Sequence, residues 1–504
     1  MDKKTIMAVI LCIGVWILWQ AVFVETPKKP ATADGGMGTN GATAASASNG
    51  GVTPEDESGQ GEKERPPEER PEERLVSMET DAYRTVWTSR GAALRDFILS
   101  NYKERVEDKK PDEFEQENLV STDKEGFLPF GIRFRVENSD FDIPRHTDWE
   151  VTAETGDEVT FRYTSQDKSK TPVITKTYKI QPDKYLIDLD IELSNRGEES
   201  LREQIVLDTF SSYSVATSSG CMGPRSTPRT PVCMVNEDLE EVDPQPGTGR
   251  TGEPGVLWTG INEQYFLQAM IPLGVDKAVC KLEARHDGIM SASLMYPQEV
   301  IPPGGSVHHA FRLYVGPKKL NILEKVNGGA GQEQGNARLT EAVDFGWFSF
   351  LCHPMLWLLK TFYGFAGNWG IAIIFLTIVV KIVLLPLTQK SMKSMREMAK
   401  LKPMMEDLKK KHGDDKQRLN QEMMNLYKVH KINPMGGCFP MLLQMPIWIA
   451  LYRMLYSSVE LYQTPFIHGW IEDLSYRDPY FILPVVLGAT MFLQQKLSPP
   501  SADT

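Results

Sequence analysis

The chain gathers its apolar residues into a few long runs near its two ends, and each run must be buried in a membrane or a core. The first run, Ile6–Val24, is broken only by one glycine and one glutamine. About 20 apolar residues in a helix cross a hydrocarbon core of about 30 Å, so this run is long enough to span a membrane. Lys3 and Lys4 precede it and bulky residues end it, which favours an uncleaved signal-anchor over a cleaved signal peptide. The sequence therefore predicts an amino-terminal transmembrane helix over residues 1–24.

Three more apolar runs lie in the carboxyl-terminal region, within a predicted helical core over residues 366–504. They predict transmembrane helices near residues 369–387, 438–456 and 480–495, the last of which is short for a span. Between the first two lies the segment 389–433, which carries 12 Lys and Arg against 6 Asp and Glu. Such an excess of positive charge is typical of cytoplasmic loops. We therefore expect the segment 389–433 to face the cytoplasm.

The aromatic-rich segment 345–365 is nearly as apolar as the predicted spans. If it crossed the membrane, the basic segment 389–433 would lie on the outer side, against its charge. We therefore interpret 345–365 as an amphipathic helix that lies in the membrane interface. The resulting topology is multi-pass, with the amino terminus in the cytoplasm and residues 25–344 mostly outside it.

The region between the anchor and the helical core divides into a linker and a folded domain. Residues 25–74 contain only two large apolar side chains, Met37 and Val52, which predicts a disordered linker. Residues 75–318 read as short strands, since segments such as 159–163 and 185–193 alternate apolar and polar residues. The fold class is therefore a multi-domain membrane protein, with an α-helical transmembrane bundle and a large extracytoplasmic β-sandwich.

One charged residue, Lys381, lies within the predicted span 369–387, four residues after Thr377 and on the same helix face. A charge at that depth is costly in lipid, so it favours a hydrated or protein-lined cavity. The alternative is that Lys381 snorkels to the nearby cytoplasmic headgroups. The predicted span 438–456 also carries polar and helix-weakening residues, which indicate a wet or protein-covered side unless they serve ordinary helix packing. These candidates for a hydrophilic groove are Pro440, Gln444 and Pro446, with Trp448 on the face of Pro440 and Gln444.

The basic segment 389–433 reads as a helical hairpin with a methionine-rich face, because its apolar residues recur at helical spacing. Methionine surfaces suit variable apolar partners, although packing within the hairpin or against lipid headgroups explains the same pattern. The residues that carry it are Met392, Met395, Met398, Met423 and Tyr427.

Composition narrows the classes of function. The net charge is −12, from 55 Lys and Arg against 67 Asp and Glu, and no basic domain for nucleic acid is present. We find no phosphate-binding loop, zinc-protease motif or nucleophile elbow, and therefore expect no enzymatic activity, catalytic residue, metal or cofactor. Cys221, Cys233 and Cys280 fall outside the cytoplasm, so one disulfide can form among them, in any of three pairings. A transporter or channel and a membrane-anchored carbohydrate-binding domain are the alternative functions.

Several motifs in the helical region, taken together, are specific. They are Asn368-Trp369-Gly370, Pro386-Leu387-Thr388, the segments 413–418 and 421–428, the segment 433–440 with its Asn-Pro-Met-Gly-Gly start, and Gln444-Met445-Pro446. These residues resemble the bacterial branch of the Oxa/Alb family of membrane protein insertases, the YidC insertases. The domain over 75–318 resembles the periplasmic domain of the Gram-negative members, through the segments 75–81 and 89–92.

The resemblance implies a non-enzymatic insertase and chaperone that moves nascent inner-membrane proteins from the cytoplasm into the bilayer. In this family the spans surround a hydrophilic groove, in which one cation receives the polar part of the substrate. The implied partners are nascent membrane proteins, the phospholipid bilayer, the Sec translocon, and the ribosome or signal recognition machinery. The sequence departs from the family pattern in two ways. Lys381 replaces the usual arginine, so the planar guanidinium group that forms two parallel hydrogen bonds is lost. The two family spans expected after Gln494 are missing, so we expect a carboxyl-terminal truncation.

Overall fold

The computed structural model describes residues 71–104, 114–165, 172–182, 184–213, 229–326, 337–343, 345–412, 415–430 and 435–497. The predicted anchor, most of the linker and Cys221 lie outside these ranges. The chain forms two compact units, which we treat separately. One unit holds residues 58–384 and 442–493, and the other holds residues 1–57, 385–441 and 494–504.

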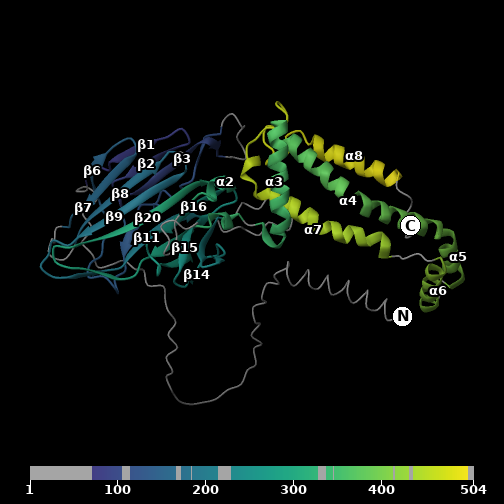
Figure 1. Cartoon of the computed structure of the whole chain (residues 1–504), viewed down its shortest axis with the longest axis horizontal. Coiled ribbons are helices and arrows are strands. Elements are labelled where there is room, and N and C mark those ends of the chain that lie inside the picture. Colours follow the sequence, from purple (N-terminus) through teal and green to yellow (C-terminus); the bar gives the residue numbers. More distant parts are fainter. Residues whose placement is uncertain are drawn as a thin grey trace, which may run out of the picture. The chain divides into compact units, whose positions relative to one another are not determined.

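Residues 75–317 fold into antiparallel β-sheets, the largest of which has nine strands (Figure 1). Its strand order is β13-β12-β15-β16-β20-β9-β8-β7-β6. The bounds are β6 Glu150–Glu154, β7 Glu158–Tyr163, β8 Val173–Gln181, β9 Leu186–Ser194, β12 Thr230–Val235, β13 Asp238–Glu241, β15 Val256–Asn262, β16 Phe266–Pro272 and β20 Ser306–Pro317.

Three smaller sheets complete the domain. Their strand orders are β14-β17-β18-β11-β5, β1-β2-β3-β4 and β10-β19. The bounds are β1 Leu75–Glu79, β2 Tyr83–Thr88, β3 Ala93–Lys103, β4 Gln116–Asn118, β5 Gly131–Phe134, β10 Leu201–Glu203, β11 Ile205–Ser212, β14 Thr248–Thr251, β17 Val279–Ala284, β18 Ile289–Met295 and β19 Glu299–Ile301.

The alternating segments of the sequence form the expected half-buried strands. In β9, Ile187, Leu189, Ile191 and Leu193 are buried, while the residues between them are more exposed. By contrast, every residue of β16 and β18 is buried, as in strands covered on both faces. The predicted fold class, a large β-sandwich attached to a helical membrane region, is confirmed.

A buried lysine ties the sheets together. Lys176 of β8 donates hydrogen bonds to the carbonyl oxygens of Ala92 (2.6 Å) and Phe130 (3.0 Å). Ala92 directly precedes β3, and Phe130 directly precedes β5. The Tyr178 hydroxyl lies within hydrogen-bond distance of the same two oxygens. Ala92 and Phe130 both adopt left-handed backbone conformations, with φ of 44° and 66°. Burial lowers the pKa of Lys176 well below its ordinary value.

A disulfide joins the nine-stranded sheet to the five-stranded sheet. Cys233 of β12 and Cys280 of β17 are bonded across 47 residues of sequence, with both side chains fully buried. The sequence left the pairing open, and the structure selects this one. Since the bond closes a long loop, it limits the freedom of the unfolded chain.

The first prediction concerns this disulfide. We expect reduction to lower the free energy of unfolding of the β-domain by about 2–4 kcal/mol, because the closed loop is lost from the unfolded state. Chemical denaturation of residues 71–343 with and without reductant measures the difference. A Cys233→Ala/Cys280→Ala variant should be insensitive to reductant, and equal stability of the oxidised and reduced protein would contradict the assignment.

The helical region begins after β20, and its main helices are α3 Ser349–Ala366, α4 Trp369–Lys400, α5 Lys402–His412, α6 Lys416–Val429, α7 Met435–Ser457 and α8 Ile482–Leu497. Four short helices accompany them: the α-helix α2 Leu320–Leu323 and the 3-10 helices η3 Leu339–Ala342, η4 Gly346–Phe348 and η5 Val459–Leu461. Among the described helices, one stretch, Trp369–Met398, is long and apolar enough to cross a membrane, with a mean hydropathy of 2.7.

The basic segment differs from the expected hairpin at its start. We expected the hairpin to begin at 389, but α4 runs without a break from Trp369 to Lys400. No glycine or proline follows Pro386 before the helix ends, so nothing in the sequence stops it. Met392, Met395 and Met398 therefore lie on the same helix as Lys381, and the hairpin itself consists of α5 and α6.

Candidate functional site

Helix α3 packs against the parts of α4 and α7 that belong to the same unit. The Cys352 thiol donates a hydrogen bond to the Ala450 carbonyl oxygen of α7 at 3.3 Å. On the other side, Tyr363 stacks on Trp369, with ring centroids 4.0 Å apart. Ala372 and Leu376 lie on the buried side of α4, and the side of α4 that faces away from this packing is exposed.

Lys381 lies on the exposed side of α4 and is directed to α7. Its Nζ atom is 5.6 Å from the centre of the Trp448 ring, and Trp448 is itself 59% exposed. No described carboxylate forms an ion pair with Lys381 within 4.0 Å. A cation over an indole ring gains about 0.5–1 kcal/mol at an exposed site, which orients the charge without neutralising it. The ammonium group therefore remains available to a visiting anion.

The other predicted groove residues are partly brought together. The exposed Thr377 lies one turn before Lys381, and its hydroxyl donates to the Ile373 carbonyl oxygen at 2.8 Å. Gln444 and Pro446 are half-buried on α7, the helix that carries Trp448. The side chain of Pro440 lies outside the described part of the chain. In helix α8, all the side chains from residue 482 to 496 are exposed.

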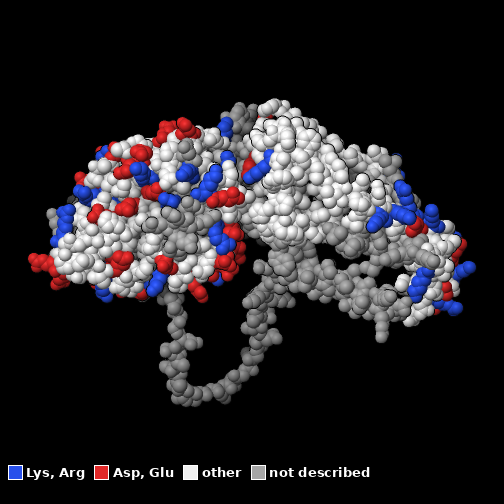
Figure 2. Space-filling model, viewed as in Figure 1, with Lys and Arg blue, Asp and Glu red and all other residues white. Residues whose placement is uncertain are grey.

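The surface around Lys381 is apolar. On α4, Ile378, Ile382 and Val383 are 48%, 62% and 68% exposed. Figure 2 shows charges of both signs over the β-sheets, whereas the helical surface seen in this view is nearly free of charge until Lys and Arg gather toward the hairpin. One cation thus stands in an otherwise apolar exposed face.

The hairpin α5–α6 uses part of its methionine-rich face for its own packing. The Tyr427 hydroxyl of α6 approaches the Met405 sulfur of α5 at 3.6 Å, and Met423 and Met398 are half-buried. Met392 is 48% exposed, and the side chain of Met395 lies outside the description. Asp415 caps α6, accepting hydrogen bonds from the backbone N–H groups of Gln417 (3.1 Å) and Arg418 (3.0 Å).

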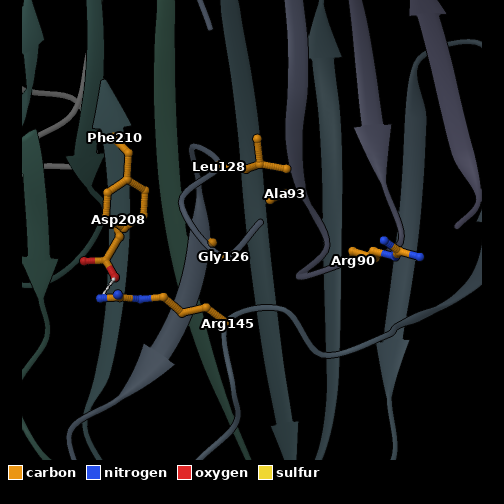
Figure 3. Close-up of a pocket in the computed structure, with 8 residues that line it drawn as sticks. Arg90, Ala93, Gly126, Leu128, Arg145, Asp208 and Phe210 are labelled. Atoms are coloured by element: carbon orange, nitrogen blue, oxygen red, sulfur yellow. Dashed lines mark hydrogen bonds and ion pairs between the residues drawn. The ribbon is translucent and has the colours of Figure 1, made fainter. Parts of the chain in front are cut away.

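The β-domain has a pocket of its own, of about 260 Å³ and open to solvent, lined by Arg90, Arg145, Asp208 and Phe210 among others (Figure 3). The Asp208 carboxylate is almost fully buried and accepts hydrogen bonds from Arg133 (2.9 Å), Arg145 (3.3 Å) and Ser293 (2.6 Å). Burial raises the pKa of Asp208, but the two guanidinium groups lower it further, so that it lies below its ordinary value. The Asp208 carboxylate is thus engaged by two guanidinium groups and a hydroxyl, which indicates a structural network.

Sequence reasoning missed two contacts that α3 and α7 make with neighbouring segments. Lys360 of α3 forms an ion pair with Glu460 at 2.8 Å, and Glu460 is only 12% exposed. The guanidinium of Arg453 packs so closely on Gly346 that a Cβ atom there would lie 2.9 Å from Nη1. A lone acid directly after an apolar run was the signal for Glu460, but its partner lies 100 residues away in sequence.

Comparison with known proteins places the chain in a family. Residues 75–358 match the family described as "YidC periplasmic domain", and residues 361–504 match "60Kd inner membrane protein". A membrane protein insertase YidC of Syntrophus aciditrophicus is 36% identical over 100% of this chain and 91% of its own length. The chain belongs to the YidC family of membrane protein insertases. The YidC of Pelobacter propionicus is 33% identical over the same shares, and that of Geotalea daltonii is 35% identical over 85% of this chain and 78% of its own length. The resemblance found in the sequence is thereby confirmed.

Solved structures add little to this assignment. A putative aldose 1-epimerase of Escherichia coli covers 48% of this chain and 99% of its own length at 10% identity, with a TM-score of 0.33. So low a score carries no argument about the activity of the YidC β-domain. Among the described residues, no group of three or more His, Cys, Asp or Glu side chains is placed to hold a metal ion.

The second prediction tests the hairpin cap. Asp415→Ala should destabilise α6 by about 1 kcal/mol, because two backbone N–H groups lose their acceptor, whereas Asp415→Asn should cost much less. Hydrogen exchange at the amides of Gln417 and Arg418 measures the effect. Equal exchange in the alanine and asparagine variants would show that the cap does not hold the helix.

Proposed function

We propose that this protein inserts nascent membrane proteins into the lipid bilayer, and that the polar part of the substrate passes beside Lys381, between α4 and α7. The single observation that carries the proposal is the Lys381 ammonium group. It is exposed, has no carboxylate partner among the described residues, and lies opposite Trp448 in the middle of an apolar face. Membership in the YidC family supports the same function.

The charge explains how a polar segment enters the bilayer. A bare lysine in lipid is costly, so water must accompany it, and that water also solvates the first residues of a translocated tail. An acidic tail gains attraction to the ammonium group, while a neutral tail gains only the water. The exposed Ile378, Ile382 and Val383 beside the site leave the apolar segment a direct path into lipid. No covalent step or nucleotide is needed.

The contact with Trp448 favours this mechanism over snorkelling. A snorkelling lysine extends along its own helix to the cytoplasmic headgroups. Here the Nζ atom instead lies against a ring of a different helix, 13 residues from the start of α7 at Met435. The side chain thus turns to the space between the helices.

We further propose a multi-pass inner-membrane location, with the amino terminus and the hairpin in the cytoplasm and residues 25–344 mostly in the periplasm. The exposed Met392 near the end of α4 and the basic surface of α5 suit contact with a nascent apolar segment, a ribosome or signal recognition machinery, or anionic lipid headgroups. Cooperation with the Sec translocon is part of the same proposal, by family resemblance.

The third prediction tests the role of the charge. Lys381→Arg should keep insertion of a substrate with an acidic translocated tail, because charge and reach are retained, while Lys381→Ala and Lys381→Glu should reduce it. An ion pair in a wet cavity is worth about 1–3 kcal/mol, so the loss of insertion should be large for acidic tails and small for neutral ones. Insertion into inverted vesicles, scored by protease protection, measures both substrates.

Trp448→Phe serves as the matched control, because it keeps a ring face opposite the lysine. If Lys381→Ala inserts the acidic-tail substrate as well as the wild type does, the groove mechanism fails for this residue.

The fourth prediction tests the topology. A cysteine introduced at Lys410 should react with a membrane-impermeant maleimide only after the inner membrane is permeabilised. A cysteine introduced at Asn236 should react in spheroplasts whose inner membrane is intact. Labelling of position 410 from outside would mean that the helix α3 spans the membrane, and the orientation of the proposed groove would be reversed.

A further inference from the structure

We propose that the loop between α7 and α8 is a joint through which the β-domain holds the outer end of the groove closed, and that Tyr462 is its positioning residue. The inference rests on the proposed insertase function and assigns a part in it to the β-domain. All the contacts below lie within one compact unit, residues 58–384 and 442–493.

The joint begins with an aromatic socket on the β-domain. The ring of Tyr462, only 8% exposed, lies 4.5 Å from Tyr265, 5.8 Å from Phe266 and 6.0 Å from Tyr102, between ring centroids. Tyr102 comes from β3 and Phe266 from β16, so the socket is formed by strands of two different sheets. Aromatic clusters of this geometry gain more than their buried area alone provides.

The neighbouring residue adds a polar latch. The side-chain amide of Gln463 bonds to both backbone groups of Lys103: its oxygen accepts from the N–H at 2.8 Å, and its nitrogen donates to the carbonyl oxygen. Lys103 is the last residue of β3 and pairs with Gln116 of β4, so the glutamine amide adds a further pair of hydrogen bonds at the end of this strand. Gln463 has a left-handed backbone with φ of 56°, a strained conformation for a non-glycine residue. The contacts with Lys103 therefore hold the loop in a shape it would not adopt alone.

A second attachment comes from the turn between β15 and β16. The Gln264 amide nitrogen donates to the carbonyl oxygen of Tyr456, near the end of α7, at 2.9 Å. The β-domain is thus hydrogen-bonded both to the end of α7 and to the loop that follows it.

The other side of the same loop covers the start of α4. Asn368 donates from Nδ2 to the Phe466 carbonyl oxygen at 3.1 Å. The Phe466 ring lies so close to Gly370 that any Cβ atom at that position would overlap it. Only two residues separate Gln463 from Phe466, so a displacement of the loop at the β-domain moves the ring that covers α4.

The position of Phe466 gives the joint its role. Gly370 precedes Lys381 by 11 residues, or about 16 Å of helix rise. The ring therefore caps α4 at its amino-terminal end, which in the proposed topology is the end of the groove that an insertase must keep closed to water and ions. The β-domain stabilises that cap through Tyr462 and Gln463.

The test compares Tyr462→Ala with Tyr462→Phe in the full chain, reconstituted in lipid nanodiscs for exchange and in vesicles for insertion. The phenylalanine keeps the ring and loses the hydroxyl, which donates to the Lys103 carbonyl oxygen at 3.4 Å. Tyr480→Ala, at a 64% exposed tyrosine near the end of the same loop, is the matched control. Hydrogen exchange at Lys103 and over 458–474 reports the joint, and insertion of an acidic-tail substrate reports function.

We expect Tyr462→Ala to raise exchange at Lys103 about tenfold or more, through local opening, and to lower insertion about threefold or more, a usual size for coupling between sites. Tyr462→Phe and Tyr480→Ala should stay near wild type. A cross-link between cysteines at 103 and 463, made with a short bismaleimide in the Tyr462→Ala protein, should restore insertion.

Two results would overturn the proposal: unchanged exchange in Tyr462→Ala, or faster exchange with undiminished insertion. Unfolding of the β-domain in Tyr462→Ala would show as a lost thermal transition. In that case Gln463→Ala, which leaves the aromatic socket intact, decides by the same two measurements. Failure of the proposed insertase function is distinct, because the wild-type protein itself would then insert no substrate.

Discussion

A positive charge inside an apolar helix must be solvated by water, paired with an anion or extended to the membrane surface. The role of the helical core depends on which of these three holds for Lys381. The structure directs its ammonium group at the Trp448 ring, 5.6 Å away on a neighbouring helix. An indole face orients a cation but does not satisfy its three N–H donors. Water or a visiting anionic group is therefore required, and the proposed groove would supply both.

The β-domain supplies rigidity rather than chemistry in this account. The buried Asp208 of its pocket is paired with two arginines, and its sheets are tied together by a disulfide and by Lys176, both buried. A rigid body of this kind is suited to fix a neighbouring loop. The aromatic socket around Tyr462 and the amide latch of Gln463 attach that loop to the domain, and Phe466 carries the constraint to the first turn of α4.

The periodicity of apolar residues in the sequence predicted several strands and helices, because these elements depend mainly on neighbouring residues. Alternation in the segments 159–163 and 185–193 predicted β7 and β9, and the apolar run at 369–387 predicted the first part of α4. The spacing of Thr377 and Lys381 placed them on one face. The hairpin was predicted in kind but began too early, since no residue between Pro386 and Lys400 interrupts the helix.

Contacts between distant segments could not be predicted in the same way. The acceptors of Lys176 lie 84 and 46 residues away in sequence, and the pairing of Cys233 with Cys280 depends on how two sheets pack. The same holds for Glu460 with Lys360 and for Tyr462 in its socket. Each of these is fixed by tertiary packing, which a single sequence does not reveal.

The most direct test of the central claim is the local water content beside Lys381, measured with the lysine in place. A nitroxide spin label at Thr377→Cys, one turn away on the same face, should show strong deuterium modulation in heavy water and low oxygen accessibility in a bilayer. The same label at Val383→Cys, an exposed residue about half a turn round the helix from Lys381, should show the reverse. This difference is what a hydrated groove predicts, and a dry, oxygen-rich signal at 377 equal to that at 383 would contradict it.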